Sequence, residues 1–508
     1  MPFLAWIAAA LLVAGSLLAP GAARAAEHPR VTIAQGVLEG RAADGVEVYK
    51  GIPFAAPPVG DGRWAAPRPA AGWSGPRDAG AFGPVCPQAR APSAVGPGRA
   101  QSEDCLTLNV WRPEGATKAP VMVWIHGGAN RFGSGADVFY NGEMFARRGV
   151  VLVTINYRLG LLGFFAHPSL GKEANLANYG LLDQIAALRW VRENIGAFGG
   201  DPDQVTIFGE SAGGGAVLNL MASPAARGLF HRATVQSGGG LRTRAGMAQA
   251  NTQGRAVADA LGLKGGAATP DALRAVPAER FVDPSVTGAP QPGFGAVVGG
   301  AELPEAPLSA IRAGRAAKVP LMIGANSWEG SLVDSFRMED EAVIRLMGGD
   351  LPMIKAAYGA EARDRAAYAR SLYGDVIFVY PAREIARAQA RQAPSFLYYF
   401  DYVPERLRDS RPGVFHAQEI PYVFGGLQGA TASGGERDKA MAAGVNGCWI
   451  AFARGGDPAG DPFCAAWSAY DARQDNWFVI RDPPASASGV RGTQLKAITT
   501  VLINLGLE

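Results

Sequence analysis

Two nearly continuous apolar runs constrain the fold of this chain more than any other feature. They read APVMVWIHGG from residue 119 and VVLVTINYR from residue 150. Strands covered on both faces have such runs, whereas a half-exposed strand alternates apolar with polar residues. The next segment, residues 181–195, repeats apolar residues at steps of three and four, which predicts a helix with one apolar face. Buried strands followed by amphipathic helices predict an α/β protein.

The same alternation continues along the chain. VTIFGES and AGGGAVLNLMA predict a strand and then a helix, and ATVQSGG and VPLMIGAN predict two more core strands. This order indicates a large, mostly parallel sheet with helices on both faces. No linker is distinct enough to divide the chain, so we expect one domain over residues 26–508.

Composition disfavours several classes of partner. Of the 508 residues, 48% are apolar and 18% are charged, and the formal net charge is only +3. There is no long basic run. Nucleic acid and anionic membrane surfaces are therefore disfavoured as partners, and oligomeric state is left open.

The first 25 residues have the pattern of a signal peptide. An apolar run from Phe3 to about Ala19 precedes a Pro-Gly break, and residues 23–25 offer a small-x-small cleavage site. The alternative is an uncleaved membrane anchor, for which the apolar run is slightly short. We expect cleavage after Ala25, a secreted or periplasmic protein, and no stable membrane association afterwards.

Four cysteines are present: Cys86, Cys105, Cys448 and Cys464. An even, small number in an exported chain suggests two disulfides, and sequence neighbours are the economical pairs among three possible pairings. Buried free thiols are the alternative, more credible for the second pair.

Ser211 is the candidate nucleophile. It stands in Gly209-Glu-Ser211-Ala-Gly213, after a predicted strand and before a predicted helix, as a nucleophile elbow requires. Residues that flank so tight a turn must lack bulk, and the helix start directs its N–H groups at the site. An ordinary glycine-rich turn is the alternative.

A serine hydroxyl needs a base, and elimination among the five histidines favours His416. It lies in a late loop, GVFHAQEIPYVFGG, beyond the main strands. The base needs an acid, and Glu329 follows the predicted strand VPLMIGAN, with Asp334 as its nearby competitor. The order Ser211, Glu329, His416 is that expected of an α/β-hydrolase.

The negative oxygen of a tetrahedral intermediate needs N–H donors. WIHGGAN follows a predicted strand, so the backbone of Gly127 and Gly128, together with Ala212, is predicted to form an oxyanion hole. His126 is expected to anchor this loop.

Taken together, the chain resembles a type B carboxylesterase, the family that includes cholinesterases and fungal lipases. The resemblance runs from about residue 31 to the C-terminus, and its motifs are YKGIPFAAPPVG, SEDCLTLNVWRP, VMVWIHGGA, INYRLGLLGFF, NYGLLDQIAALRWVRENIGAFGGDPDQVTIFGESAGG, VQSG, GANSWEG and FHAQEIPYVFG. It implies the α/β-hydrolase fold, the same triad and oxyanion donors, a Cys86–Cys105 disulfide, and Ser237 as a serine that supports the acid.

The chain departs from the family pattern at several positions. Ala129 replaces the usual third glycine after the histidine, and Asn130 stands where an aromatic is common. VVGG at 297–300 lacks the acid of the usual VxDG. The segment between Cys86 and Cys105 has no aromatic residue, so choline esters are disfavoured, because a quaternary ammonium binds an aromatic face.

These observations predict a secreted serine esterase that acts on small-molecule carboxylic esters through an acyl-enzyme, with no metal and no organic cofactor. Arg131, just past the oxyanion loop, is a candidate to bind an anionic or polycarboxylic acyl group, as in toxin esters; a solvated arginine is the alternative. Lipase, thioesterase or amidase activity, or a binding protein without activity, are the other functions considered.

Overall fold

The computed structural model describes residues 28–89, 100–170, 177–239, 246–283, 286, 295–427 and 434–504. The predicted signal peptide lies outside these residues. The strands, in chain order, are β1 Arg30–Ile33, β2 Gly36–Glu39, β3 Arg41–Ala43, β4 Val46–Pro53, β5 Pro76–Asp78, β6 Thr107–Pro113, β7 Ala119–Ile125, β8 Val151–Ile155, β9 Gly200–Glu210, β10 Arg232–Gln236, β11 Leu321–Asn326, β12 Ser395–Phe400, β13 Asn476–Ile480 and β14 Ala485–Ser488.

A large mixed sheet organises the described part of the chain. Eleven strands pair in the order β14-β13-β12-β11-β10-β9-β7-β8-β6-β4-β3 within that part. All pairs from β8 to β13 are parallel, and the pairs at both edges are antiparallel. The mostly parallel sheet was predicted. The N-terminal segment VTIAQGVLEG folds as the hairpin β1–β2 in a separate small sheet with β5, because the chain reverses between Ile33 and Gly36.

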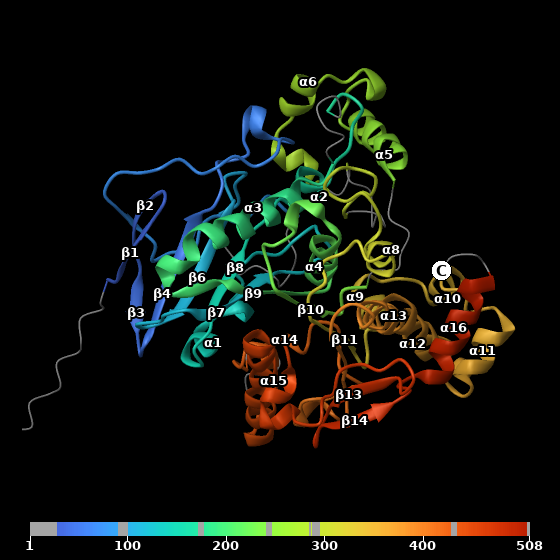
Figure 1. Cartoon of the computed structure of the whole chain (residues 1–508). Coiled ribbons are helices and arrows are strands. Elements are labelled where there is room, and N and C mark those ends of the chain that lie inside the picture. Colours follow the sequence, from blue (N-terminus) through green and yellow to red (C-terminus); the bar gives the residue numbers. More distant parts are fainter. Residues whose placement is uncertain are drawn as a thin grey trace, which may run out of the picture.

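Helices cover both faces of the large sheet (Figure 1). The α-helices are α1 Glu143–Arg147, α2 Gly160–Gly163, α3 Tyr179–Asn194, α4 Ala212–Ala222, α5 Met247–Ala260, α6 Pro270–Arg274, α8 Pro307–Arg312, α9 Ser331–Ser335, α10 Asp340–Leu346, α11 Pro352–Tyr358, α12 Arg365–Gly374, α13 Tyr380–Gln389, α14 Ile420–Val423, α15 Glu436–Gly455 and α16 Gly492–Asn504. A π-helical turn, Asp375–Val379, joins α12 to α13.

The alternation of side chains along β7 shows why its sequence is continuously apolar. Val121, Val123 and Ile125 belong to one core cluster with residues of α3, α4 and α13. Met122 and Trp124 belong to a second cluster, with residues of α1, α14 and α15. Successive side chains point to opposite faces, so a strand between two helical layers must be apolar at every position. Figure 1 shows α3 and α15 on opposite sides of the sheet.

The parallel core also brings distant loops together. The neighbouring strands β7, β9, β10 and β11 all run in one direction, so the loops that follow them meet at one edge. These loops begin after Ile125, Glu210, Gln236 and Asn326. Ligands of parallel sheets bind at this carboxyl edge, where the predicted site residues also lie.

Candidate functional site

Ser211 lies in a strained turn between β9 and α4. Its backbone has φ 56° and ψ −122°, which side-chain-bearing residues rarely adopt. A Cβ on Gly209 would lie 2.6 Å from the Ile125 carbonyl oxygen, and one on Gly213 would overlap that oxygen. The two glycines are therefore needed for close packing of the turn against β7. The strand, sharp turn and helix that a nucleophile elbow requires are all present.

Glu329 and His416 meet behind the carboxyl ends of β11 and β12. His416 Nδ1 donates to Glu329 Oε2 at 2.5 Å. Glu329 Oε1 accepts from Ser237 Oγ at 2.5 Å and from the Asn326 backbone N–H at 2.8 Å. Glu329 is 1% exposed, so both of its oxygens are held by protein donors away from water. Ser237 therefore contacts the acid as the resemblance implied.

Backbone contacts between two loops fix this pair. Residues 328 and 415 form a parallel bridge, and the Trp328 N–H donates to the Val414 carbonyl at 2.9 Å. The His416 N–H donates to Ser331 Oγ at 3.0 Å. The loop after β11 thus carries the acid and also anchors the loop of the histidine. The competitor Asp334 instead pairs with Arg370 at the surface, away from this arrangement.

The other edge of the His416 ring faces an acid that the sequence reasoning missed. His416 Nε2 lies 3.1 Å from Glu210 Oε1. Within the described residues, Nε2 makes no hydrogen bond, so the Ser211 hydroxyl is not its partner here. Catalytic hydrogen bonds of serine hydrolases often tighten only when substrate binds. The sequence feature that could have indicated Glu210 is its position directly before Ser211, at the end of β9.

Charge around the imidazole favours its protonated form. Burial alone would lower the pKa of His416, but Glu210 and Glu329 together raise it to about 9. Burial raises the pKa of Glu210 to about 8, although the nearby His416 opposes this. The acid behind the ring and the acid before Ser211 therefore both stabilise an imidazolium, the species that a general base becomes when it accepts a proton.

A second buried acid, Glu419, was also missed. It accepts from Gln236 Nε2 at 2.9 Å and from Asn326 Nδ2 at 2.6 Å. Burial raises its pKa above the usual range, against the effect of these hydrogen bonds. It lies three residues after His416, and its chain neighbours gave no sign of its burial. Glu419 thus ties the histidine loop to the ends of β10 and β11.

The loop after β7 has three consecutive residues with positive φ. Gly128, Ala129 and Asn130 have φ of 102°, 54° and 57°. A Cβ on Gly127 would lie 3.1 Å from the Ser211 Cβ, so this loop passes directly beside the serine. The third predicted donor, Ala212, is the first residue of α4. Arg131 follows, and its N–H donates to the Gly128 carbonyl at 2.9 Å.

His126 anchors that loop, as predicted. Its ring stacks on Tyr157 with centroids 4.5 Å apart, and its Nδ1 lies 2.8 Å from the Gly127 carbonyl oxygen. Burial lowers its pKa to about 4, which keeps the ring neutral. Two more histidines have structural contacts: His167 with Ser169, and His231 with the Val205 N–H.

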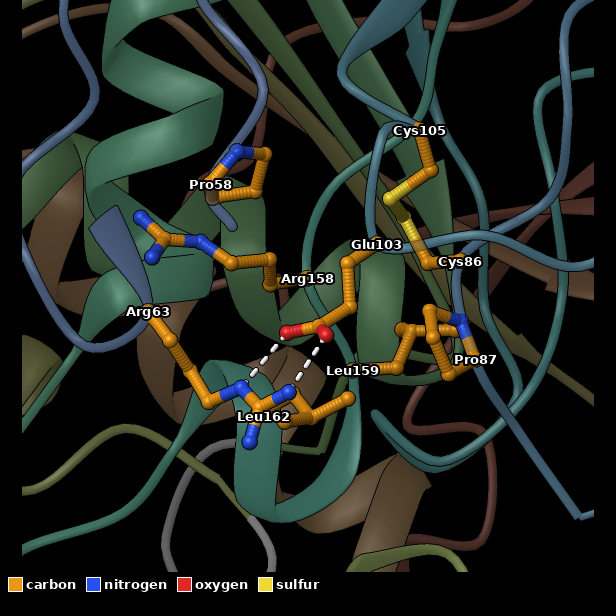
Figure 2. A pocket seen from close by; sticks show the side chains of 9 residues that line it. All are labelled: Pro58, Arg63, Cys86, Pro87, Glu103, Cys105, Arg158, Leu159 and Leu162. Atoms are coloured by element: carbon orange, nitrogen blue, oxygen red, sulfur yellow. Dashed lines mark hydrogen bonds and ion pairs between the residues drawn. A yellow bond between two sulfur atoms is a disulfide. The ribbon is translucent and has the colours of Figure 1, made fainter. Parts of the chain in front are cut away.

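Both pairs of neighbouring cysteines form disulfides, Cys86–Cys105 and Cys448–Cys464. The first borders a small cavity of about 10 Å³ (Figure 2). Beside it, the Arg63 guanidinium donates hydrogen bonds to the two oxygens of Glu103 at 2.7 and 2.5 Å. Figure 2 draws these contacts as dashed lines. None of the triad candidates lines this cavity.

Neither a metal site nor a membrane span emerges from the described ranges. They contain no group of three or more His, Cys, Asp or Glu side chains arranged to hold a metal ion. Nor does any helix in these ranges have the length and apolar character to cross a bilayer.

Comparison with known sequences gives one consistent result. The family model described as "Carboxylesterase family" matches residues 27–498. The chain is 40% identical to para-nitrobenzyl esterase of Bacillus subtilis (strain 168), over 87% of this chain and 93% of that protein. It is 37% identical to fumonisin B1 esterase of Sphingopyxis macrogoltabida, over 83% and 81% of the two chains.

Solved structures agree with the sequence comparison. A PNB esterase structure superposes with a TM-score of 0.80 at 36% identity, covering 93% of this chain and all (100%) of that one. A carboxylesterase of Geobacillus stearothermophilus gives a TM-score of 0.81 at 36% identity, over 92% and 99% of the two chains. The resemblance drawn from the motifs and the predicted α/β-hydrolase fold are confirmed.

Proposed function

The chain belongs to the carboxylesterase family and is a carboxylic ester hydrolase, and from this premise we propose that Ser211, His416 and Glu329 are its catalytic triad. The observation that carries the proposal is the short contact of His416 Nδ1 with Glu329, 2.5 Å, while Nε2 lies 3.1 Å from Glu210, the residue directly before Ser211. A buried acid on Nδ1 leaves Nε2 as the nitrogen that can accept a proton.

The reaction follows from these positions. Ser211 Oγ attacks the ester carbonyl carbon while His416 Nε2 takes its proton, and the N–H groups of Gly127, Gly128 and Ala212 stabilise the oxyanion. The imidazolium then protonates the leaving alcohol, which leaves an acyl-serine. Water, deprotonated by the same nitrogen, attacks the acyl carbon and releases the acid. In each step His416 returns the proton that it accepted to the leaving oxygen, which is that of the alcohol in the first step and Ser211 Oγ in the second.

Replacing the nucleophile tests the triad. We expect Ser211→Ala to lose roughly four orders of magnitude in kcat on p-nitrophenyl acetate, with an unchanged circular dichroism spectrum. Ser335→Ala is the matched control, since the hydroxyl of this exposed residue donates to the Ser331 carbonyl, and the variant should keep wild-type activity. Retention of hydrolysis by the Ser211→Ala protein would disprove the assignment.

For the substrate, we propose that Arg131 favours esters with an anionic or polycarboxylic acyl group, including toxin esters. One relative is named as an esterase of fumonisin B1. Arg131 is partly buried beside the oxyanion loop, and burial lowers the pKa of its guanidinium. A partly desolvated cation at this place would attract a carboxylate on the acyl chain.

Matched substrates separate this proposal from a solvated arginine. Wild type, Arg131→Lys and Arg131→Ala are compared on p-nitrophenyl hemisuccinate and p-nitrophenyl butyrate. The alanine variant should lose about tenfold in kcat/KM on the anionic ester alone, with partial recovery by lysine. An equal loss on both esters contradicts the proposal.

We also propose that the protein is exported after cleavage behind Ala25. Two disulfides support this, since such bridges persist in oxidising compartments. The N-terminal residue of protein recovered from the periplasm or medium of an expressing bacterium should be Ala26. An intact N-terminus in a membrane fraction would favour the anchor instead.

A further inference from the structure

We propose that Arg491, just before the C-terminal helix α16, is a positioning residue for the active site. Through Asp375 it fixes the π-helical turn Asp375–Val379, which holds Phe378 against the ring of His416. The inference rests on the proposed function, because it concerns the orientation of the imidazole that is assigned there as base.

The π-helical turn and the residue before it lie against both members of the acid–base pair. The turn interrupts an otherwise continuous helix formed by α12 and α13. Directly before it, a Cβ on Gly374, the last residue of α12, would lie 3.3 Å from the Glu329 Cβ. Further along, the Phe378 ring lies with its centroid 5.0 Å from that of His416, at an interplanar angle of 45°. A π turn adds one residue to a helical turn and so rotates the side chains after it, and such turns are frequent at functional sites.

Phe378 makes an apolar contact with the His416 ring, whose nitrogens face acidic groups. The acidic groups that face His416 are Glu329 on Nδ1, Glu210 near Nε2, and Glu419 from its own loop. These contacts act on the ring nitrogens. Phe378, 7% exposed, packs against the ring from a different element, so displacement of the π turn would free the imidazole to rotate.

Asp375 anchors the turn to Arg491. Asp375 is 3% exposed, accepts from Tyr358 Oη at 2.8 Å, and accepts from Arg491 Nη2 at 2.7 Å. Arg491 Nη1 also donates to Glu361 at 2.8 Å. The backbone of Arg491 has φ 55°, a conformation that costs free energy and persists where surrounding contacts fix it. The guanidinium thus joins the start of α16 to the turn beneath Phe378.

The C-terminal helix has other anchors, so docking it does not require this ion pair. Leu495, Ala497 and Ile498 of α16 are buried. Arg383 of α13 donates to Thr499 Oγ1 at 3.1 Å. Loss of the Arg383 contact would loosen the same helix without touching Asp375, so Arg383→Met is a matched control for stability alone.

A double-mutant cycle tests the link. Arg491→Met, Phe378→Leu, their combination, Arg491→Lys and Arg383→Met are assayed on p-nitrophenyl acetate from pH 5 to 10, well below their unfolding temperatures. We expect Arg491→Met and Phe378→Leu each to lower kcat about tenfold and to shift the pH midpoint of kcat/KM. The combination should be no worse than Arg491→Met alone, and lysine should restore most of the loss. Arg383→Met should lower the unfolding temperature and leave the midpoint unchanged.

Several results would overturn the inference. Losses that multiply in the double variant would show that Arg491 and Phe378 act independently. Equal behaviour of Arg491→Met and Arg383→Met would show a structural role only. If Arg491→Met does not fold, the Phe378→Leu midpoint decides, and an unshifted profile of that variant rejects the link. A failure of the proposed function is recognised separately, because Ser211→Ala would then remain active.

Discussion

His416 lies between two carboxylates, with Glu329 Oε2 2.5 Å from Nδ1 and Glu210 Oε1 3.1 Å from Nε2. Burial of the ring opposes its protonation, and the two acids outweigh that effect and raise the pKa of His416 to about 9. An imidazolium cannot accept the proton of Ser211. In the proposed mechanism, ionised Glu210 would therefore help to stabilise the charge formed on His416 but would also lower the fraction of His416 that is free base.

The first prediction is that Glu210→Gln shifts the pH dependence of kcat/KM to lower pH. Activity needs neutral His416, so it rises with pH through the pKa of that ring. Removing a negative charge beside Nε2 favours the neutral form, and the rising limb should move down by roughly one unit. Glu305→Gln is the control, since Glu305 pairs with Arg315 at the surface. A profile that superposes on that of wild type would show that Glu210 does not act on His416.

The second prediction ranks the supports of the acid. Ser237 Oγ and the Asn326 N–H both donate to Glu329 Oε1, so Ser237→Ala removes one of two donors. A hydrogen bond to a charged group contributes about 1.5 kcal/mol, so kcat should fall about tenfold. Glu329→Gln should cost roughly four orders of magnitude, because it removes the charge and reverses the preferred tautomer. Equal kcat losses in the two variants would contradict this ranking.

Local sequence was sufficient to predict the turn at Ser211 and the glycine loop after β7, because short-range geometry determines both. A glycine-flanked serine between a strand and a helix leaves few conformations open, and the observed backbone of Ser211 agrees with that reading. The loop after β7 was found in the same way, from two glycines behind a buried strand. The continuous apolar runs indicated the doubly covered sheet, because a strand with helices on both faces must be apolar at successive positions.

The parts that sequence did not predict depend on contacts between distant segments. Glu210 became notable only because a loop far along the chain places His416 against it. Asp375, in the π turn between α12 and α13, accepts a hydrogen bond from Arg491, near the C-terminus, and local sequence does not show that contact. Glu419 looked like any loop acid until its partners at the ends of β10 and β11 were known.

The third prediction concerns the first disulfide. The Cys86–Cys105 bridge joins residues 19 positions apart, and in the chain-entropy model its removal costs about 3 kcal/mol. The free energy of unfolding of Cys86→Ser/Cys105→Ser, measured in urea, should fall by that amount, with kcat unchanged at 25 °C. The Cys448–Cys464 bridge spans 16 positions, so its double-serine variant should lose a similar amount. Unchanged unfolding in both variants would contradict the entropic argument.

The fourth prediction is that Arg158→Met strongly destabilises the fold. Arg158 Nη2 and Nε donate to the two oxygens of Asp183 at 2.7 and 2.8 Å, and the side chains are 4% and 0% exposed. Methionine fills much of the volume but leaves Asp183 as a buried, unpaired charge, which costs about 3–5 kcal/mol.

The control for this prediction is an arginine–carboxylate ion pair of the same protein that is exposed to solvent. Arg315 donates to both oxygens of Glu305 at 2.6 Å, with side chains 60% and 27% exposed. Exposed pairs contribute little, because solvent screens both charges and the unpaired partner stays hydrated. Arg315→Met should therefore unfold at the same urea concentration as wild type, while Arg158→Met unfolds at a clearly lower one. Asp183→Leu combined with Arg158→Met should recover part of the loss, since no charge is then left buried. Equal urea midpoints for the two single variants would show that burial does not decide the contribution of these pairs.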